Sequence, residues 1–525
     1  MQQKACKPFT YRTRINTCKE LDDDLTKCSY LLSKVERSLF KDYYQKNKNI
    51  NELKSFYIKR FGITARQFNS CRIKLKGKVS SFKTLLKERT SNLETRIRKL
   101  KKHIKNLKDP FKKHHKKRLL CKLEKKLENL KIDIKENRVR ICFGSKKLFR
   151  KQFSLEENAY TSHDEWKKTW QDKRNDSFFL VGSKDETNGN QSCQITCSGD
   201  NFNLIVRLPN SFSRKSIVLE DICFAYGQEE IFRAIDENEK RKDLKKEKRP
   251  YSHLGKALSY LFKKDKKGWT VFVTVDKDKP NKTSNSNIGM IGLDINVNHI
   301  ALAETDHFGN IIYKKNIPLN LYGKDKNQTL AIIGDATREI VEIAIAKEKP
   351  IVLEDLNFEK KKQALKEQKN KYSRMLSSFA YSKIVTFIES RSFKKGIQIY
   401  KVNPAFTSII GRVNFKDRYG LSGHQAAALT IARRVCRYSE KPPRYLEIEN
   451  KDSKSAFFLH DVNRKKHVWS FYSWLNKKLK AANVLQLSTI FRSSRPMEPL
   501  CDSKASIIYR GSFGTLIVNK TARLT

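Results

Sequence analysis

Two carboxylates in the C-terminal half of the chain stand at the ends of apolar, strand-like runs. Asp294 closes the apolar part of "IGMIGLDI", and Glu354 closes that of "PIVLED". A carboxylate at the end of a buried strand loses hydration, which is costly unless a cation lies beside it. Mg²⁺ meets this need because it prefers oxygen ligands and keeps several waters, so that two or three protein groups suffice. One or two Mg²⁺ ions held here could activate a water for phosphodiester hydrolysis. The alternative is that each acid is paired with a lysine.

A histidine occupies a third position of interest. The segment "YGLSGHQAAALTIARR", residues 419–434, is typical of a turn followed by a helix of small residues, with His424 in its first turn. Position 427, which shares a helix face with His424, is an alanine. An imidazole can act as a base or a metal ligand near neutral pH, so His424 is a candidate catalytic residue. Asp417, in the preceding loop, is a possible displaced third acid. A solvent-exposed residue at a helix N-terminus is the simpler interpretation of His424.

The order of secondary structure around these residues indicates how they would be positioned. "IGMIGLDINVNHIALAETDHFGNIIYKKNIPL" contains three strand-like runs joined by short turns. A helix is predicted at about 327–348, a strand after Pro350, a helix at about 374–394 and a strand at "IQIYKV". This βββαβαβα order predicts an RNase H-like α/β domain over 286–440, in which the strands that carry Asp294 and Glu354 are neighbours.

The N-terminal part predicts a long, basic helical hairpin. "FTYRTRIN", within residues 1–16, alternates like a strand, and helical sequence occupies 17–137. Two apolar series at heptad spacing lie on either side of a break at Pro110. The first is Leu86, Leu93, Ile97, Leu100, Ile104 and Leu107; the second is Leu120, Leu123, Leu127, Leu130 and Ile134. The two helices can therefore close into an antiparallel hairpin, whose lysine-rich outer faces favour contact with a nucleic-acid backbone.

Residues 138–285 predict a β-rich module, and the last 85 residues give little information. The strand-like runs of the module are "RVRICFG", "SFFLVGS", "NFNLIVRLP" and "WTVFVTVD", and "DKDKPNKTSNSN" at 276–287 is a polar linker. After residue 440, "HVWSFYSWLNKKLKAANVLQL" is compatible with an amphipathic helix and "ASIIYRGSFGTLIVNK" with a hairpin. We assign no role to this extension, 441–525. The fold class predicted for the whole chain is α+β multidomain.

The charge of the chain points to a polyanionic partner. Its 525 residues carry 110 Lys and Arg against 56 Asp and Glu, a formal net charge of +54. Lysines run through the whole chain rather than along one amphipathic helix, which favours nucleic acid over a membrane surface. The start lacks an apolar leader and no apolar run is long enough to span a bilayer, so we expect a cytoplasmic protein, nucleoid-associated if prokaryotic. The 11 cysteines fit reduced thiols. Cys193 and Cys197 have no second pair nearby to complete a zinc site.

Four segments carry a resemblance to a known family. "GLDINVNHIALA", "IVLEDLNF", "KGIQIYKVNPAFTSIIG" and "GHQAAALTIARR", within about 286–437, resemble the RuvC-type nuclease segments of TnpB proteins of insertion sequences, relatives of the type V CRISPR effectors. The resemblance implies that the protein binds a guide RNA, that the RNA pairs with target DNA and that the RuvC domain cuts DNA. It assigns the first two catalytic acids to Asp294 and Glu354. Upstream, the order of elements resembles, in outline, the recognition lobe (17–137) and the wedge module (1–16 and 138–285) of that family.

The chain departs from the family pattern in two places. Members of the family carry a four-cysteine zinc knuckle after the "NPAFTS"-like segment, but residues 408–424 contain no cysteine, so we expect no zinc site. The family aspartate at the start of the last helix is also missing, and RuvC-type nucleases outside the family often carry His and Asp three apart on that helix. The sequence therefore predicts an RNA-guided, Mg²⁺-dependent DNA endonuclease in which His424 stands in for an acid. The alternative is a catalytically inactive, repressor-like RNA-guided DNA-binding protein.

Four further residues are candidates for nucleic-acid contact. Thr407 and Ser408 could hold a backbone phosphate or simply cap a turn. Arg433 and Arg434, near the end of the last helix, could touch phosphate; favourable placement at a helix C-terminus explains them equally well.

Overall fold

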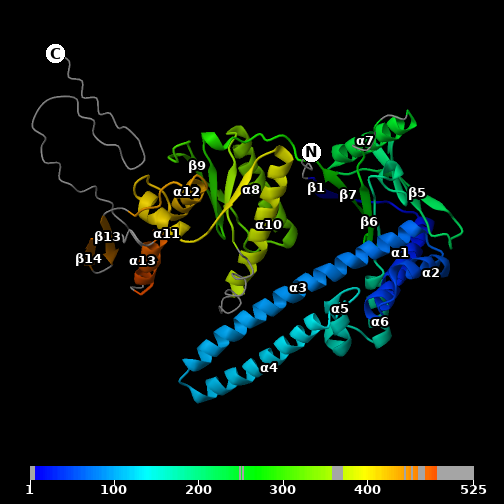
Figure 1. The fold of residues 1–525 in the computed structure, drawn as a ribbon, viewed down its shortest axis with the longest axis horizontal. Coiled ribbons are helices and arrows are strands. Elements are labelled where there is room, and N and C mark those ends of the chain that lie inside the picture. Colours follow the sequence, from blue (N-terminus) through cyan, green and yellow to red (C-terminus); the bar gives the residue numbers. More distant parts are fainter. Residues whose placement is uncertain are drawn as a thin grey trace, which may run out of the picture. The chain divides into compact units, whose positions relative to one another are not determined.

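The computed structural model describes residues 6–247, 250, 254–356, 371–442, 445–450, 453–458 and 467–481. The chain divides into two compact units, Met1–Asp278 and Lys279–Thr525, at a point inside the polar linker 276–287. Each unit combines helices and sheets (Figure 1). Among the described residues, no helix is long and apolar enough to cross a membrane.

The first unit contains two antiparallel sheets. One has the strand order β1-β7-β6-β2, so that the first strand of the chain pairs with the last strand of the unit. The other has the order β3-β4-β5. The strands are β1 (Lys7–Arg14), β2 (Ser177–Leu180), β3 (Cys193–Ser198), β4 (Asn201–Arg207), β5 (Ser216–Ile222), β6 (Leu258–Asp265) and β7 (Gly268–Lys277). Alternate residues of β4, β6 and β7 are buried, as expected of strands with one face on a core.

The first unit also contains helices, of which the first three and the last contribute side chains to the core of these sheets. They are α1 (Lys19–Leu39), α2 (Ile50–Phe61), α3 (Ala65–Lys105), α4 (Pro110–Lys135), α5 (Lys146–Arg150), α6 (His163–Arg174) and α7 (Gln228–Lys246). A π-helical turn, Phe40–Gln45, continues α1. The strand predicted at "RVRICFG" is wrong: residues 138–144 form no strand. Val139, Ile141 and Phe143 alternate because they pack one side of an irregular segment against the core, and Phe143 contacts the Phe40 ring edge-on, with 5.5 Å between ring centroids.

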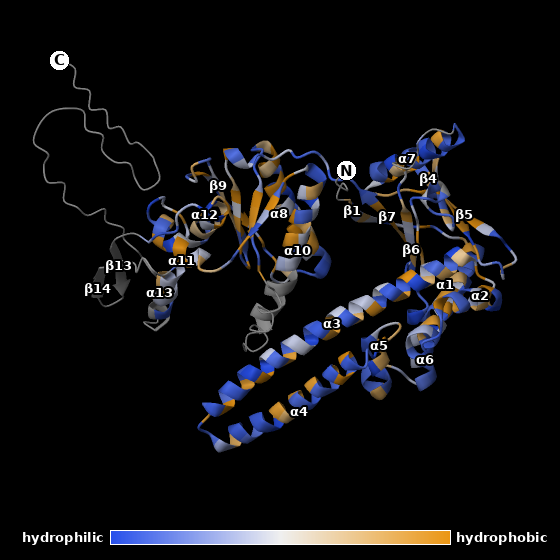
Figure 2. Cartoon of the chain, viewed as in Figure 1, coloured by the Kyte–Doolittle hydropathy of each residue, from blue (hydrophilic) through white to orange (hydrophobic). Residues whose placement is uncertain are grey.

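The helical hairpin predicted from the heptads is present as α3 and α4 (Figure 1). Thr64 and Gln67 form a capping box at the start of α3, and Asp109 caps α4, with Pro110 in its first turn. Both helices are predominantly hydrophilic with apolar residues between them (Figure 2). The apolar contact is made by Leu93, Ile97, Leu100, Leu119, Leu120, Leu123, Leu127 and Leu130.

The last residue of the second heptad series lies outside this contact. Ile134 is 40% exposed, whereas its neighbour Asp133 is buried. Asp133 accepts a charge-assisted hydrogen bond of 2.7 Å from Arg140 in the chain that returns from the hairpin. The pairing of Asp133 with that return segment, rather than the heptad, therefore sets the face that α4 buries at its end.

The second unit is built on a five-stranded mixed sheet. Its strands are β8 (Ile291–Ile295), β9 (His299–Thr305), β10 (Ile311–Pro318), β11 (Ile351–Glu354) and β12 (Ile399–Val402). The order is β10-β9-β8-β11-β12; the first three strands pair antiparallel, and β11 pairs parallel with both β8 and β12. This is the arrangement that the βββαβαβα order predicted for an RNase H-like sheet.

Helices cover both faces of this sheet. Side chains of α8 (Lys326–Ala346) and α10 (Lys371–Lys395) pack on Ile291, Leu293 and Leu353 at one face. At the other face, α12 (Gly423–Val435) approaches β8 so closely that a Cβ on Gly292 would lie 2.1 Å from the Ala428 carbonyl oxygen. The alanines predicted to suit packing on a sheet are therefore buried there.

Further elements follow β12. They are α11 (Thr407–Gly411), a π-helical turn (Arg412–Lys416), the antiparallel pair β13 (Tyr445–Asn450) and β14 (Ser453–Phe458), and α13 (Trp469–Ala481). The helix predicted in the C-terminal extension is α13, whose Tyr472 and Leu475 pack into the core formed with α11 and α12. The hairpin predicted at "ASIIYRGSFGTLIVNK" lies outside the described residues.

Candidate active site

Asp294 and Glu354 lie at the ends of neighbouring parallel strands. The register pairs Gly292 with Val352, and each acid follows two residues after its member of that pair. Alternate residues of a strand share a face. Gly292 contacts α12, and Val352 packs with Ile431 and Ala432 of the same helix. Both carboxylates therefore belong to the face of the sheet that α12 covers, at neighbouring strand ends.

His424 contacts the first of these acids. Its Nδ1 lies 2.9 Å from Asp294 Oδ2, which also accepts a 3.0 Å hydrogen bond from Asn296 Nδ2. A carboxylate can only accept, so Nδ1 carries the hydrogen of this contact and Nε2 is the acceptor nitrogen of the neutral ring. The His424 side chain is 50% exposed, against 13% for Asp294. His424 thus contacts a largely buried carboxylate on one side and solvent on the other.

A capping box fixes the start of the helix that carries His424. Ser422 Oγ accepts from the Gln425 amide at 3.2 Å, and Gln425 Oε1 accepts from the Ser422 amide at 3.1 Å. These bonds satisfy amides that the first turn leaves unpaired. The positive end of the α12 dipole consequently lies beside the Asp294 carboxylate.

A second histidine, which the sequence analysis did not single out, stands beside the first. His299 begins β9, and its ring meets that of His424 edge-on, with centroids 4.9 Å apart. Burial lowers the pKa of His299, and the nearby His424 lowers it further, while Asp294 acts in the opposite direction. The neutral form of His299 is therefore favoured beside His424.

Glu354 is oriented by a buried threonine. Thr407, at the start of α11, donates a 2.6 Å hydrogen bond from Oγ1 to Glu354 Oε1. Thr407 is only 2% exposed. The buried hydroxyl of Thr407 therefore orients the Glu354 carboxylate. Ser408, the next residue, is exposed to solvent.

Tyr381 of α10 lies in the field of both acids. Burial is the largest cause that raises the pKa of its phenol, followed by the charges of Glu354 and Asp294. Because the two carboxylates act on the same hydroxyl, Tyr381 provides a second indication, independent of strand register, that they share one neighbourhood. Nothing in the local sequence distinguishes Tyr381 from an apolar helix position, which is why sequence reasoning missed it.

The two arginines near the end of α12 are occupied within the protein. Arg433 is 3% exposed, donates to the carbonyl of Gly309 and lies over the rings of Phe415 and Tyr438, at 5.1 and 4.9 Å from their centroids. Such burial places its guanidinium away from solvent and from a phosphate backbone. The contacts of Arg433 are therefore those of a structural residue.

Arg434 ties the loop before α11 to the chain that follows α12. It forms a 2.6 Å ion pair with Glu440 and donates to the carbonyls of Asn403 and Ala405. In the same loop Phe406 adopts a left-handed backbone with φ of +61°, a costly conformation for a bulky residue. Arg434 thereby holds the loop that delivers Thr407 to Glu354.

Asp417 does not join Asp294 among the described residues, and Cys193 and Cys197 cannot share one metal ion. Asp417 is exposed and follows the π-helical turn 412–416, and the described residues record no contact between it and Asp294. Cys193 is buried in β3, where burial raises the pKa of its thiol well above the usual range, whereas Cys197 is exposed. Residues four apart on a strand are roughly 13 Å apart, too far to share one ion.

The donor set suits a hard cation that needs few protein ligands. Within the described part of the chain, no group of three or more His, Cys, Asp or Glu side chains is arranged to hold a metal ion. Mg²⁺ commonly takes only one or two carboxylates and completes its shell with water and substrate phosphate. The contacts of Asp294 to His424 and Asn296 use Oδ2, so Oδ1 stands outside them. Asp294 and Glu354 therefore fit Mg²⁺ better than a metal that demands a full protein cage.

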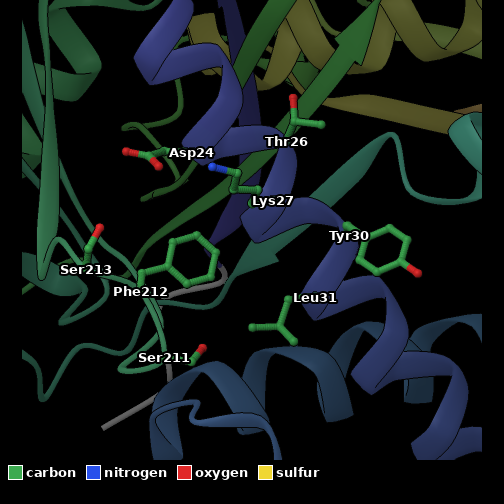
Figure 3. Close-up of a pocket in the computed structure, with 8 residues that line it drawn as sticks. All are labelled: Asp24, Thr26, Lys27, Tyr30, Leu31, Ser211, Phe212 and Ser213. Atoms are coloured by element: carbon green, nitrogen blue, oxygen red, sulfur yellow. The ribbon is translucent and has the colours of Figure 1, made fainter.

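A separate pocket of about 600 Å³, open to solvent, lies on the first unit (Figure 3). Lys27 and Leu31 of α1 face Phe212, which belongs to the loop before β5. The pocket is also lined by Asp24, Thr26, Tyr30, Ser211 and Ser213. None of the candidate catalytic residues contributes to it.

Comparisons with known proteins returned only distant structural likenesses. No family model and no curated protein matches the chain. The chain aligns with the Cas12f1–sgRNA–target DNA complex at 13% identity and a TM-score of 0.24, covering 81% of this chain and 99% of that one. A CRISPR–Cas12f ternary complex aligns at 14% identity and a TM-score of 0.21, covering 81% and 98%.

A shorter likeness involves RuvC. T. thermophilus RuvC in complex with a Holliday junction substrate aligns at 12% identity and a TM-score of 0.21, covering 28% of this chain and 90% of that one. At these TM-scores the likenesses do not decide the fold, which rests on the strand order and directions of the sheet.

Proposed function

We propose that the chain is an RNA-guided DNA-binding protein and Mg²⁺-dependent DNA endonuclease of the TnpB type, with His424 in place of an acid at the third catalytic position. The observation that carries the proposal is the 2.9 Å contact between His424 and Asp294, with Glu354 at the end of the neighbouring parallel strand. The basic hairpin and the net charge of +54 supply surface for RNA and DNA.

Each residue has a defined role in this proposal. Asp294 and Glu354 would hold one or two Mg²⁺ ions, which supply Lewis-acid stabilisation of charge on the scissile phosphate. His424 accepts a proton from the attacking water at Nε2, while Asp294 fixes the ring through Nδ1. Thr407 keeps one oxygen of Glu354 in a fixed orientation. Half of the His424 side chain is exposed, which leaves room for a phosphate and a water beside it.

The second candidate function is an RNA-guided DNA-binding protein that does not cut. It is favoured by one specific observation: Ala427, one helical turn beyond His424, is buried and carries no ligand atom. In this case His424 would simply neutralise Asp294, and the site would lack a third group for the metal. Both candidates share the guide RNA and the DNA target, so cleavage alone separates them.

The deciding experiment begins with the protein purified together with its bound nucleic acid, which is sequenced. A discrete RNA is expected. The complex is then given DNA that carries the complement of that RNA, with and without Mg²⁺, beside the Asp294→Asn and Glu354→Gln variants. Cleavage that needs Mg²⁺ and falls at least about a thousand-fold in both variants supports the endonuclease. Guided binding without cleavage supports the second candidate, and absence of a discrete RNA overturns both.

A further inference from the structure

The end of the helical hairpin combines dense positive charge with an exposed aromatic ring. We define the hairpin tip as residues 99–118, the end of α3, the turn and the first turns of α4. It contains nine lysines and one arginine against a single acid, Asp109. The net charge of +9 within 20 residues far exceeds what solubility of a short surface segment needs.

Most of these cations have no acidic partner among the residues that the structure describes. Within the described residues, Lys112 pairs with Asp109 at 3.0 Å and Lys101 with Glu124 at 2.8 Å. The other eight form no ion pair with a described residue; they are Lys99, Lys102, Lys105, Lys108, Lys113, Lys116, Lys117 and Arg118. Like charges this dense repel one another, so a polyanion that binds here removes an unfavourable interaction.

An aromatic ring stands in the middle of this charge. Phe111, the residue after Pro110, is 73% exposed. Asp109 accepts from the backbone amides of Phe111 and Lys112 at 3.0 and 3.1 Å, which fixes the backbone under the ring. The ring of His115, one turn further along α4, meets it edge-on with centroids 4.9 Å apart. Phe111 thus presents a positioned, solvent-facing ring that contributes nothing to the hairpin core.

The positive charge alone would suit any nucleic acid, but the exposed ring of Phe111 favours single strands over duplexes. In a duplex the base faces are covered by their neighbours, so an exposed ring has little to stack on. In a single strand each base offers a face, and stacking on an aromatic side chain combines with cation contacts to the flanking phosphates. We propose that the hairpin tip binds a single-stranded stretch of nucleic acid, with one base stacked on Phe111 and the adjoining phosphates on its unpaired lysines.

This inference adds to the proposed function. It rests on that function only for where the bound single strand comes from. Two sources share the chemistry: an unpaired segment of the guide RNA and a displaced DNA strand. The preference of the tip for RNA or DNA of the same sequence distinguishes them, and either preference supports the proposal.

The test measures equilibrium binding of the full-length protein after its bound nucleic acid has been removed. The probes are labelled single strands of RNA and DNA of about twelve nucleotides, a length in the range of one single-strand site, and the corresponding blunt duplex. Phe111→Ala is expected to weaken single-strand binding about five-fold to a hundred-fold, with little effect on the duplex. Phe111→Trp should restore it. The matched control is Phe153→Ala, which removes another ring of the first unit that is 76% exposed.

A second measurement locates the bound strand. Oligonucleotides that carry 4-thiouridine are photo-crosslinked to the wild-type protein, and the modified peptides are mapped by mass spectrometry. A crosslink in the peptide that contains Phe111, lost in Phe111→Ala, supports the proposal. Equal loss of single-strand and duplex binding, an effect no larger than that of Phe153→Ala, or crosslinks confined to other peptides overturns it. If the wild-type protein binds none of the probes, this inference fails, whereas the proposed function is decided separately by the co-purified RNA.

Discussion

The contact between His424 and Asp294 turns a lone histidine on a helix into a candidate catalytic group. Ordinary helix-end histidines face solvent, and half of this side chain does, yet its Nδ1 is fixed by a carboxylate that is mostly buried. That geometry leaves Nε2 as the proton acceptor. Substitution of His424 should therefore remove this proton acceptor.

His424→Ala is expected to lower the rate of DNA cleavage by about a hundred-fold to ten-thousand-fold, the usual contribution of a positioned general base. The measurement is single-turnover cleavage by the guided complex, with guide binding followed in parallel. Guide binding should not change, because the side chain is half exposed and makes no core contact. Asp417→Asn serves as the matched control: it should leave the rate unaltered, and a comparable loss there would instead identify Asp417 as the third group.

The hydrogen bond from Thr407 to Glu354 predicts that substitution of Thr407 changes the Mg²⁺ concentration needed for cleavage. Thr407→Val keeps the shape of the buried side chain but removes the hydroxyl that orients Glu354 Oε1. Loss of such an outer partner typically costs about ten-fold to a hundred-fold in metal affinity or activity. The Mg²⁺ concentration for half-maximal cleavage should therefore rise, and Thr407→Ser should return it toward the wild-type value. An unchanged Mg²⁺ requirement in Thr407→Val would assign Thr407 to packing alone.

At the scale of elements, the approach of α12 to the sheet is what brings His424 to Asp294. A Cβ on Gly292 would lie 2.1 Å from the Ala428 oxygen and 2.7 Å from the Ala432 nitrogen, and neither backbone atom can move without the helix. This contact is the reason for the small residues that the sequence shows on α12.

Gly292→Ala should consequently destabilise the second unit and reduce cleavage together. Overpacking of this kind costs about 1 to 3 kcal/mol, here with added displacement of His424. Denaturant unfolding and the cleavage rate are the measurements. The matched control is Gly334→Ala in α8, where the new Cβ would have only Arg391 Nη2 nearby, at 3.8 Å. That variant should keep activity and gain up to about 1 kcal/mol from helix propensity. Equal behaviour of the two variants would refute the packing explanation.

Sequence patterns predicted the elements of the five-stranded sheet and the hairpin, but they did not predict β3, β5, β6 or α7, nor the contacts between elements. The meander, the crossover helices and the hairpin followed from apolar periodicity, which reports which face each element buries. Residues 138–144 misled because alternation also arises when an irregular segment packs one side on a core. The roles of Thr407, Tyr381 and Arg434 depend on side chains brought together from different elements, and no spacing within one element encodes such contacts. Arg433 likewise has the residue type of a phosphate ligand but the burial of a core group.

At the scale of the whole molecule, a net charge of +54 makes binding of nucleic acid strongly dependent on salt. Each lysine that contacts a phosphate releases a counterion, and the slope of log affinity against log salt records their number. For single strands the slope should fall by about 0.7 for each contacting lysine that is removed.

We therefore expect the double variant Lys113→Ala, Lys117→Ala to flatten this slope by about 1.4 for a single-stranded probe, since both lysines lack acidic partners in the described structure. Lys240→Ala is the control, because Lys240 already pairs with Asp236 at 2.6 Å. The measurement is a titration at four or more salt concentrations. A slope that both variants leave alone would mean that the hairpin lysines serve solubility.

The pairing of Gly292 with Val352 also determines where the five-stranded sheet can accept an inserted residue. One residue inserted within either strand would slide Leu353 or Leu293 to the level of the opposite acid and turn one carboxylate to the far side of the sheet. Lengthening the turn between β9 and β10 would disturb neither. Relatives that diverge in size should thus differ in their connections, while the count of residues from each strand's start to its acid stays constant.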